Sequence, residues 1–551
     1  MDRNYAPLEF ILHVGLSVKR SMVQQSREVP STSDRHIDSA SRNRSSILVF
    51  TVILTIFIGA RLWRLTGPCL WFDEIFSIHA ARHDWSSLIR FVAADIIHPP
   101  LFYLLLKIWI SICGESLLWL RLFPALTSIA ALIPFWFLCR ELRLGVTETN
   151  LALLLLAVNG YLIKYAQEVR MYGLLLFLSV CSLWLFVRFF KASAGARKQL
   201  IILSIVNLLL IYTHYYGWLV VAGELSIVLV WQRQKLLDLF IATAVLLLAF
   251  SPWVYAVAAI SGRGDLTQNI GWIARPHLSD IAQFFILLNE PFYFRQSSVE
   301  PLYYRGSALL GFLLLTVPIL VMLWKTYRQR HAPGSGQWLF VFSAIIIGLA
   351  FLLSWIFPYS VWGTRHLIVL AVPYAVLAAI ALNRLQPYWL KTTVVLIFGC
   401  WLFLAGTIFL LRRPVTFIWC AWEQLAQQIT EQPRSAAPVK IYAFEDLIAY
   451  HLWFALQEQD RNRFSIAVIK YVPGVEEDPA YFLPRGLSDI AAIDLAQFDE
   501  AESWIAFRDF KWDENRPPLK TLLERGYKVG NVLEVSAGGQ RAFLVRIVRI
   551  R

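Results

Sequence analysis

Two adjacent carboxylates, Asp73 and Glu74, stand in the stretch CLWFDEIFSIHAARH, directly after an apolar run long enough to cross a bilayer. A chain that only reverses direction uses glycine, asparagine or serine. The start of a helix could also favour the two carboxylates through its dipole. Adjacent helical residues point about 100° apart, so these side chains cannot share a proton. We therefore expect separate tasks, one carboxylate facing a cavity and the other holding the structure.

Two further segments place polar residues between apolar ones. DIIHPPLFY contains Asp95 and His98; a helix start explains its two prolines but not the acid and the histidine. YAQEVRMYG contains Glu168, Arg170 and Tyr172 in a short turn between two apolar spans. A simple turn rarely needs an acid, a base and two tyrosines, which favours a functional role.

Two more candidates lie at the ends of apolar spans. His214 in THYYG is a weak signal, because a histidine among tyrosines is also typical of an aromatic belt. Arg365 and His366 open a span in VWGTRHLIVLAVP. A cation at that end violates the charge bias of membrane proteins, which indicates an anion to bind.

Carboxylates, histidine and arginine at membrane level suit attack on a group attached to a lipid phosphate. A sugar on a polyprenyl phosphate already has a good leaving group, so a general acid is not essential. Such an enzyme needs a base for the acceptor hydroxyl and cations for the departing phosphate.

The composition indicates a polytopic membrane protein. Hydrophobic residues make up 57% of the 551 residues and charged residues 16%, with a mean hydropathy of +0.54, which is far too apolar for a soluble protein. The formal charge is +13. This excess indicates basic loops retained in the cytoplasm and contact with anionic membrane lipids, not nucleic acid.

About eleven segments approach the roughly 20 apolar residues that a span requires. They are 47–66, 117–139, 148–164, 172–190, 199–219, 219–231, 237–257, 307–324, 338–357, 366–382 and 392–411.

A cytoplasmic N-terminus makes every inner loop basic, as the positive-inside rule requires. We therefore predict a multi-pass protein of the inner (cytoplasmic) membrane with its candidate residues at the outer side. The outer segments are 67–116, 165–171, 212–217, 258–306, 358–365 and everything after 411.

The first outer loop, 67–116, is expected to form two helices lying on the membrane. The segment 99–113 is apolar but short and interrupted by Lys107, and counting it as a span would place the later basic loops outside. Residues 72–90 have apolar positions at helical spacing and form the other interfacial helix.

The two ends of the chain differ from this apolar middle. Residues 1–45 are polar and rich in serine and arginine, and we expect a disordered cytoplasmic tail. From 412 onward charged residues, strand-like runs and helical runs alternate, which predicts a soluble α/β domain outside the membrane at 412–551. The six cysteines lack metal-ligand spacing, and we interpret them as small core residues, not as disulfide partners.

In order along 46–411, the motifs FDE, HPPLFYLLLKIW, YAQEVRMYGLLL, THYYG and TRHLIVLAVP resemble the bacterial branch of the protein O-mannosyltransferase-like family. That family includes aminoarabinose transferases and has the C-type glycosyltransferase fold. The resemblance implies a polytopic α-helical enzyme, with a sugar moved from a polyprenyl-phosphate donor to an acceptor glycan, lipid or protein. TRHL departs from the Arg-Tyr pair common in relatives, so the role of His366 is open.

The resemblance implies Asp73 as the catalytic carboxylate with Glu74 as its neighbour, and we group both as catalytic candidates. The candidate substrate-binding residues are His98, Glu168, Arg170, Tyr172, His214, Arg365 and His366. We assign no metal ligands and no cofactor, and a divalent cation stays open.

A transporter or flippase for lipid-linked sugars is the main alternative function. It would place ionisable residues near the midplane of spans and repeat its two halves, and the sequence has neither pattern. A scaffold is a third alternative, which the polar residues gathered at the outer ends of spans disfavour.

Overall fold

The structure is a computed structural model that describes residues 32–192, 197–261, 271–292, 302–328, 335–411, 417–433, 438–460, 462–478 and 480–550. The chain divides into two compact units, 1–54 and 55–551. The described part of the first unit belongs to helix α2, Thr32–Leu62. The end of the predicted tail is therefore helical, and its first 31 residues lie outside the described part.

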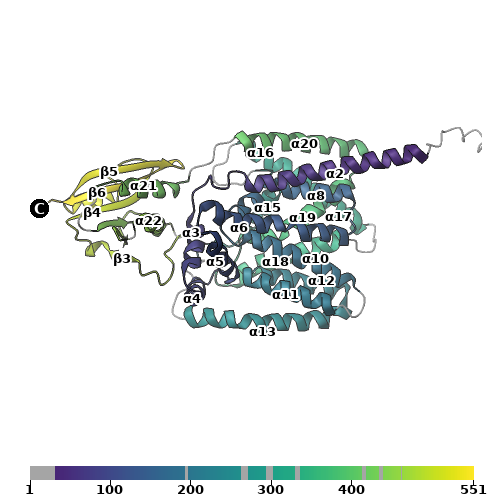
Figure 1. The fold of residues 1–551 in the computed structure, drawn as a ribbon, viewed down its shortest axis with the longest axis horizontal. Helices are drawn as coiled ribbons and strands as arrows, with labels where there is room; N and C mark the ends of the chain where they lie inside the picture. Colours follow the sequence, from purple (N-terminus) through teal and green to yellow (C-terminus); the bar gives the residue numbers. More distant parts are fainter. Residues whose placement is uncertain are drawn as a thin grey trace, which may run out of the picture. The chain divides into compact units, whose positions relative to one another are not determined.

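A helical bundle makes up most of the second unit (Figure 1). Its helices are α6 Leu117–Ala130, α7 Leu132–Glu141, α8 Val146–Val158, α9 Gly160–Ala166, α10 Tyr172–Lys191, α11 Arg197–Thr213, α12 Gly217–Trp231, η1 Arg233–Lys235, α13 Leu236–Ser261, α15 Leu278–Asn289, α16 Leu302–Gly311, η2 Phe312–Thr316, α17 Val317–Arg328, α18 Ser335–Ile356, η3 Thr364–Leu370, α19 Ala371–Asn383 and α20 Tyr388–Leu411.

Among the described residues, seven helical stretches are long and apolar enough to cross a membrane. They coincide with seven of the predicted spans and confirm a polytopic helical protein. The other four predicted spans are shorter or interrupted: Asn159, for example, caps α9 by accepting the backbone N–H of Leu162 and so breaks 148–164 into α8 and α9. Helix α15 lies in a segment predicted to be an outer loop.

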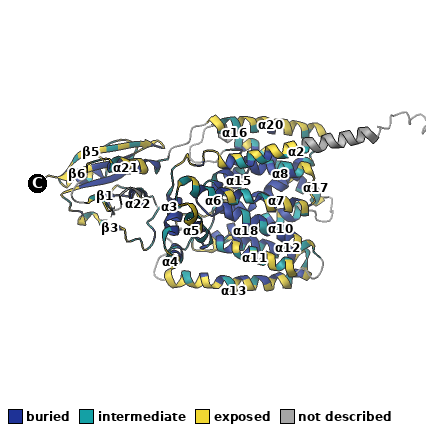
Figure 2. Ribbon diagram, in the orientation of Figure 1, coloured by how far each residue is buried: buried dark blue, intermediate teal, exposed yellow. Residues whose placement is uncertain are grey.

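Burial separates central helices from peripheral ones. In the stretch 364–383, which contains α19, 89% of the apolar window is buried, whereas α20 buries only 11%. Figure 2 shows long exposed runs on α13 and α20. The exposed side chains there are large and apolar, including Leu248 at 75% and Phe403 at 78% exposure. Such a surface suits contact with lipid.

The first loop forms three helices, so the single helix predicted over 72–90 is wrong. They are α3 Phe72–Arg82, α4 Trp85–Asp95 and α5 Leu101–Cys113. The break has a clear cause, because Asp84 accepts hydrogen bonds from the backbone N–H groups of Ser86 and Ser87 and so starts a new helix. After α4 the chain turns through Ile96, with a left-handed φ of 71°, before the two prolines that precede α5.

The C-terminal region forms the predicted α/β domain around one six-stranded sheet with strand order β3-β2-β1-β4-β6-β5. Strands β1 to β4 pair in parallel and β6 runs antiparallel to both β4 and β5. The elements are α21 Cys420–Thr430, β1 Val439–Ala443, α22 Asp446–Asp460, β2 Phe464–Lys470, β3 Ile490–Asp494, η4 Leu495–Gln497, β4 Glu502–Asp509, α23 Leu519–Glu524, β5 Tyr527–Ala537 and β6 Gln540–Arg549.

Buried apolar side chains of the central strands form the core of this domain. Inward side chains of neighbouring strands face one another, as at Phe507 and Phe543, which are in register and stack at 5.1 Å. The buried core also contains Phe444, Ile505 and Val545. The segment SAGGQR forms the hairpin turn that joins β5 to β6.

A disulfide between Cys69 and Cys420 joins the start of the first loop to the start of α21. The prediction that all six cysteines are unpaired core residues is therefore wrong. The two partners are 351 residues apart in sequence, so only the folded arrangement brings them together. The other four cysteines are free.

Candidate active site

Glu74 lies in a fully satisfied ion pair inside the protein. Its carboxylate accepts hydrogen bonds from Nε and Nη2 of Arg121, at 3.0 and 2.9 Å. The Glu74 side chain is 1% exposed and that of Arg121 is 3% exposed. The backbone N–H groups of Trp71 and Val169 also donate to it, at 3.2 and 2.9 Å. Arg121 donates further to the backbone oxygens of Leu65, Pro68 and Cys69. This network fixes the first turn of α3 to α6 and to the turn before α10.

Asp73 occupies the other side of the same helical turn. Its Oδ2 lies 3.1 Å from Nη1 of Arg365 and 3.7 Å from Nη2 of Arg170. Its side chain is 22% exposed. The two adjacent carboxylates therefore have different surroundings, as the sequence predicted.

Arg170 is held in place by groups from α3, from α5 and from the loop between α4 and α5. Its Nη1 donates to the backbone oxygen of Asp73 at 3.3 Å, and to the hydroxyls of Ser77 and Tyr103 at 3.4 Å each. Its Nη2 lies 3.4 Å from Nδ1 of His98. The guanidinium is almost fully buried, at 4% exposure, so it presents a fixed positive charge next to Asp73.

The turn that carries Arg170 packs closely on α6. Gly173 permits this, because a Cβ there would overlap the carbonyl oxygen of Pro124. Glu168 in the same turn pairs with Lys164 at 2.8 Å. Burial raises the pKa of Glu168 above its usual range, although Lys164 opposes this rise. Tyr172 is completely buried beside the ring of His366.

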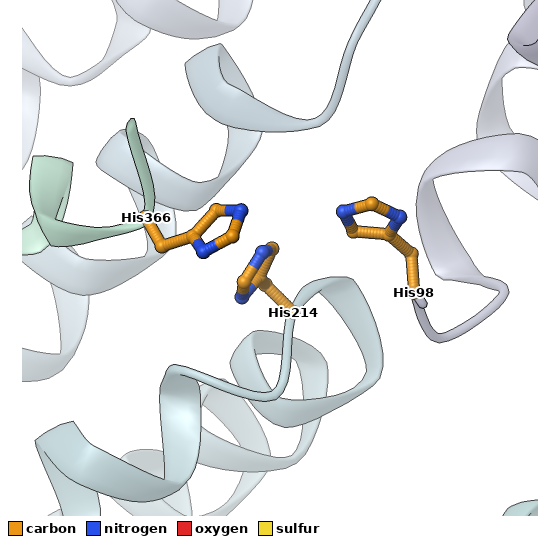
Figure 3. Close-up of side chains that lie close together, drawn as sticks. All are labelled: His98, His214 and His366. Atoms are coloured by element: carbon orange, nitrogen blue, oxygen red, sulfur yellow. The ribbon is translucent and has the colours of Figure 1, made fainter. Parts of the chain in front are cut away.

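Figure 3 shows His98, His214 and His366 pointing toward one another from three different segments. The ring centroids of His214 and His366 are 4.6 Å apart, and those of His98 and His214 are 5.2 Å apart. One ligand atom from each ring lies within 4.8 Å of the others, a spacing compatible with a metal ion. Gly363 leaves room for the ring of His366, which a Cβ would overlap.

Asp95 is a second carboxyl group near this cluster. It is buried, and burial raises its pKa to about 7, with Arg170 opposing the rise and Asp73 adding to it. His98, three residues further on, is 2% exposed. Burial and the charge of Arg170 hold the pKa of His98 well below its usual range.

The C-terminal domain contacts the helix that carries Asp73. Tyr450 of α22 lies with its hydroxyl 2.9 Å from Nδ1 of His79, and its ring packs 5.1 Å from Phe72. Tyr481 packs on Phe72 from another side, at 5.2 Å. Together with the disulfide, these contacts tie the domain to α3.

The structure thus brings all nine candidate residues into one region around Asp73 and the histidines. Sequence reasoning missed Arg121, Ser77, Tyr103 and the contacts from the C-terminal domain. Arg121 carried a readable signal, because a charged residue inside an apolar span usually has a partner. The other contacts depend on tertiary structure and have no local signal.

No family model matches this chain, and no curated protein matches it in sequence. The solved structures similar to it include two of ArnT from Cupriavidus metallidurans. The structure bound to undecaprenyl phosphate is 14% identical, covers 91% of this chain and 97% of its own, and has a TM-score of 0.56. The apo structure is 14% identical, covers 92% and 98%, and has a TM-score of 0.54. The predicted fold class is confirmed: over nearly its whole length this chain has the fold of ArnT.

Proposed function

We propose that this protein is an inverting membrane glycosyltransferase that moves a sugar from a polyprenyl-phosphate donor to an acceptor hydroxyl. The observation that supports this most is a partly exposed carboxylate, Asp73, paired with Arg365 at 3.1 Å and next to the buried Arg170. A base and cations for a phosphate thus lie side by side. The fold shared with ArnT, which was solved with undecaprenyl phosphate, adds to this support.

In the proposed reaction Asp73 accepts the proton of the acceptor hydroxyl. The acceptor oxygen then bonds to the first carbon of the sugar while the bond from that carbon to the phosphate oxygen breaks. A single displacement of this kind inverts the configuration at that carbon. The bonding electrons leave with the polyprenyl phosphate, which therefore gains negative charge.

Arg365 and Arg170 receive that charge in the proposal. Arg365 keeps 25% of its side-chain exposure and pairs with Asp73, so an arriving phosphate can take the place of Asp73 on its guanidinium. This exchange would free the carboxylate for the acceptor. Guanidinium binds phosphate through two parallel hydrogen bonds, which suits it to this role. Arg170 is fixed by its own hydrogen bonds and contributes a charge that does not need to move.

We assign Glu74 a positioning role, although the sequence grouped it with Asp73 as catalytic. Its oxygens receive four hydrogen bonds from Arg121, Trp71 and Val169, so it has little capacity left for a substrate proton. Its ion pair instead holds the first turn of α3. That turn fixes the backbone of Asp73.

The proposed location is the cytoplasmic membrane, with the site and the C-terminal domain on the outer side. The supporting observation is the basic character of the inner loops in this threading. A reporter fused after Arg551 should be active only outside the cytoplasm. Activity of a reporter that works only in the cytoplasm would reverse the orientation.

Incubation of the purified protein with a panel of radiolabelled polyprenyl-phosphate sugars tests the function. We expect loss of label from one lipid and its appearance in an added acceptor fraction. Intact labelled lipid that only changes leaflet in a reconstituted vesicle would instead identify a flippase. The acceptor class, whether glycan, lipid or protein, follows from the fraction that gains the label.

A further inference from the structure

The histidine cluster of His98, His214 and His366 has a chemistry that its spacing alone does not reveal. The three side chains come from the loop before α5, the turn between α11 and α12, and the start of η3. They are 2%, 3% and 9% exposed. Buried imidazoles this close together can serve a metal ion through their lone pairs or an anion through their N–H groups. The position of the ring protons decides between the two.

The neighbours of His98 fix its ring proton. A guanidinium can only donate hydrogen bonds, and Nη2 of Arg170 lies 3.4 Å from Nδ1 of His98. Nδ1 must therefore accept. In the neutral ring the proton is then on Nε2, which is buried and has no partner among the described residues.

His214 has the same tautomer for an independent reason. The backbone N–H of Tyr216 donates to its Nδ1 at 3.1 Å, so the proton again lies on Nε2. This Nε2 is also buried, and no described residue accepts from it. Burial, followed by the charges of Arg170 and Arg365, lowers the pKa of His214 to about 3, so the ring is neutral and carries one proton.

This arrangement is unfavourable for a metal ion. A histidine that binds a metal donates its other ring N–H to a carboxylate, a carbonyl or water. Here the other ring nitrogen of His98 faces a cation and that of His214 faces an N–H group. Both Nε2 atoms carry protons and lack the lone pair that a metal needs. Arg170 and Arg365 add positive charge nearby, which also favours an anion.

We infer that His98, His214 and His366 bind a phosphate oxygen as uncharged hydrogen-bond donors. The Nε2–H groups of His98 and His214 supply two donors, and Arg170 strengthens the first by polarising the ring from the far side. His366 supplies the third from whichever ring nitrogen carries its proton, since both are buried without partners in the described part of the chain. This inference rests on the proposed function only for the source of the phosphate, which is the head group of a polyprenyl phosphate.

Paired substitutions at His214 separate an anion site from a metal site. His214→Gln replaces Nε2–H with an amide N–H donor, whereas His214→Asp supplies a carboxylate that repels anions and can bind metals. We expect His214→Gln to stay within about tenfold of wild-type phosphate affinity and His214→Asp to lose about 100-fold. A metal site predicts the reverse, with metal retained by His214→Asp and lost by His214→Gln. The same pair at His98 provides a second test in case either His214 variant does not fold.

Binding of farnesyl phosphate, inorganic phosphate and Zn²⁺ to the full chain in detergent should be measured by calorimetry, with metal content by mass spectrometry. The exposed His277 provides matched controls, His277→Gln and His277→Asp, which should leave all affinities unchanged. The expected order for both phosphates is wild type, then the Gln variants, then the Asp variants.

Retained phosphate affinity in the Asp variants, or about one Zn²⁺ per wild-type chain that is lost in the Gln variants, would overturn the inference. Failure of the wild type to bind either phosphate would overturn it as well. If inorganic phosphate binds with the expected order of affinities among the variants and farnesyl phosphate does not bind, the histidine site is supported. A polyprenyl phosphate is then excluded as the source of the phosphate. Binding of farnesyl phosphate without any sugar transfer would support the site and contradict only the proposed reaction.

Discussion

Two carboxylate–guanidinium pairs occupy the first turn of α3, and they differ in almost everything except their chemistry. The Glu74–Arg121 pair is 1% and 3% exposed and is surrounded by further hydrogen bonds. The Asp73–Arg365 pair is 22% and 25% exposed, and within the described residues one hydrogen bond, from Arg365, reaches the Asp73 carboxylate.

The difference follows from helix geometry. Adjacent residues point about 100° apart, so one carboxylate can enter the protein while the other stays partly exposed. A buried pair must be completely satisfied, because an unpaired buried charge is costly. A partly exposed pair can exchange partners with little cost. The comparison therefore assigns structure to Glu74 and chemistry to Asp73, and each assignment can be tested separately.

Asp73→Asn should give the largest effect on activity. The amide keeps the size of the side chain but cannot accept the acceptor proton, and loss of a general base typically costs about 10²–10⁴-fold in rate. Turnover of radiolabelled donor should fall by this factor while the melting temperature is kept. Asp84→Asn provides a matched control, since asparagine caps a helix as well as aspartate does. Wild-type turnover in a folded Asp73→Asn protein would exclude Asp73 as the base.

Arg365 tests the second half of the exposed pair. Arg365→Ala should lose both donor binding and turnover, with a rate loss of about 10²–10³-fold, as for other groups that stabilise developing charge. Arg365→Lys should retain part of the binding but little turnover, because lysine cannot form two parallel hydrogen bonds with phosphate. Steady-state kinetics and direct binding separate the two effects. Arg90→Ala, on the exposed side of α4, should change neither.

If Arg365→Ala keeps wild-type rate and donor affinity, the phosphate is held elsewhere. Arg170 would then be the next candidate, because it is the other guanidinium beside Asp73.

Glu74→Gln should affect stability first. It leaves Arg121 buried next to a neutral amide, and breaking a buried pair costs about 3–5 kcal/mol. We expect a clearly lower melting temperature in detergent and activity that falls with the folded fraction. The partly exposed Arg82–Glu115 pair, at 27% and 29% exposure, provides the comparison, since Glu115→Gln should cost about 1 kcal/mol or less. Equal melting temperatures for the two variants would contradict the proposal that Glu74 stabilises the fold through its ion pair with Arg121.

The sequence identified charged residues that lie together in the structure better than it predicted the packing around them. Asp73, Arg170 and Arg365 could be identified because each is a charged residue at a place where a membrane protein gains nothing from charge alone. The sequence could not predict that Arg170 and Arg365 lie within 4 Å of Asp73. The three residues come from segments separated by apolar helices, and only the folded structure brings them together.

The missed features depend on contacts between distant segments. No sequence spacing relates Cys69 to Cys420. Their disulfide depends on the fold, which brings α21 next to the first loop. The break at Asp84 was readable, because aspartate is a typical residue at the start of a helix, but apolar periodicity over 72–90 obscured it. The strand-containing region after 412 could be predicted because β1, β2 and β6 are rich in β-branched and aromatic residues.

Asp95 should give the smallest effect, and it sharpens the comparison because this carboxyl group is buried like Glu74 yet lies near the exposed pair. Its pKa is raised to about 7 by burial, so it is neutral below that pH and ionised above it. The charged and titratable groups that face it are Arg170, Asp73, Arg485, Tyr103, Tyr215 and Tyr450.

Ionised Asp95 offsets part of the positive charge of Arg170, to which the proposed reaction assigns a role in binding the donor phosphate. The KM for the donor should therefore rise as the pH increases through about 7, by less than about tenfold, since a tenfold change corresponds to one pKa unit of coupling. Asp95→Asn cannot ionise, so its KM should stay at the low-pH value while kcat follows the wild type. Parallel pH profiles of KM for the two proteins would show that Asp95 does not act on the donor site, and the ion pairs of Asp73 and Arg170 would then account for donor binding without it.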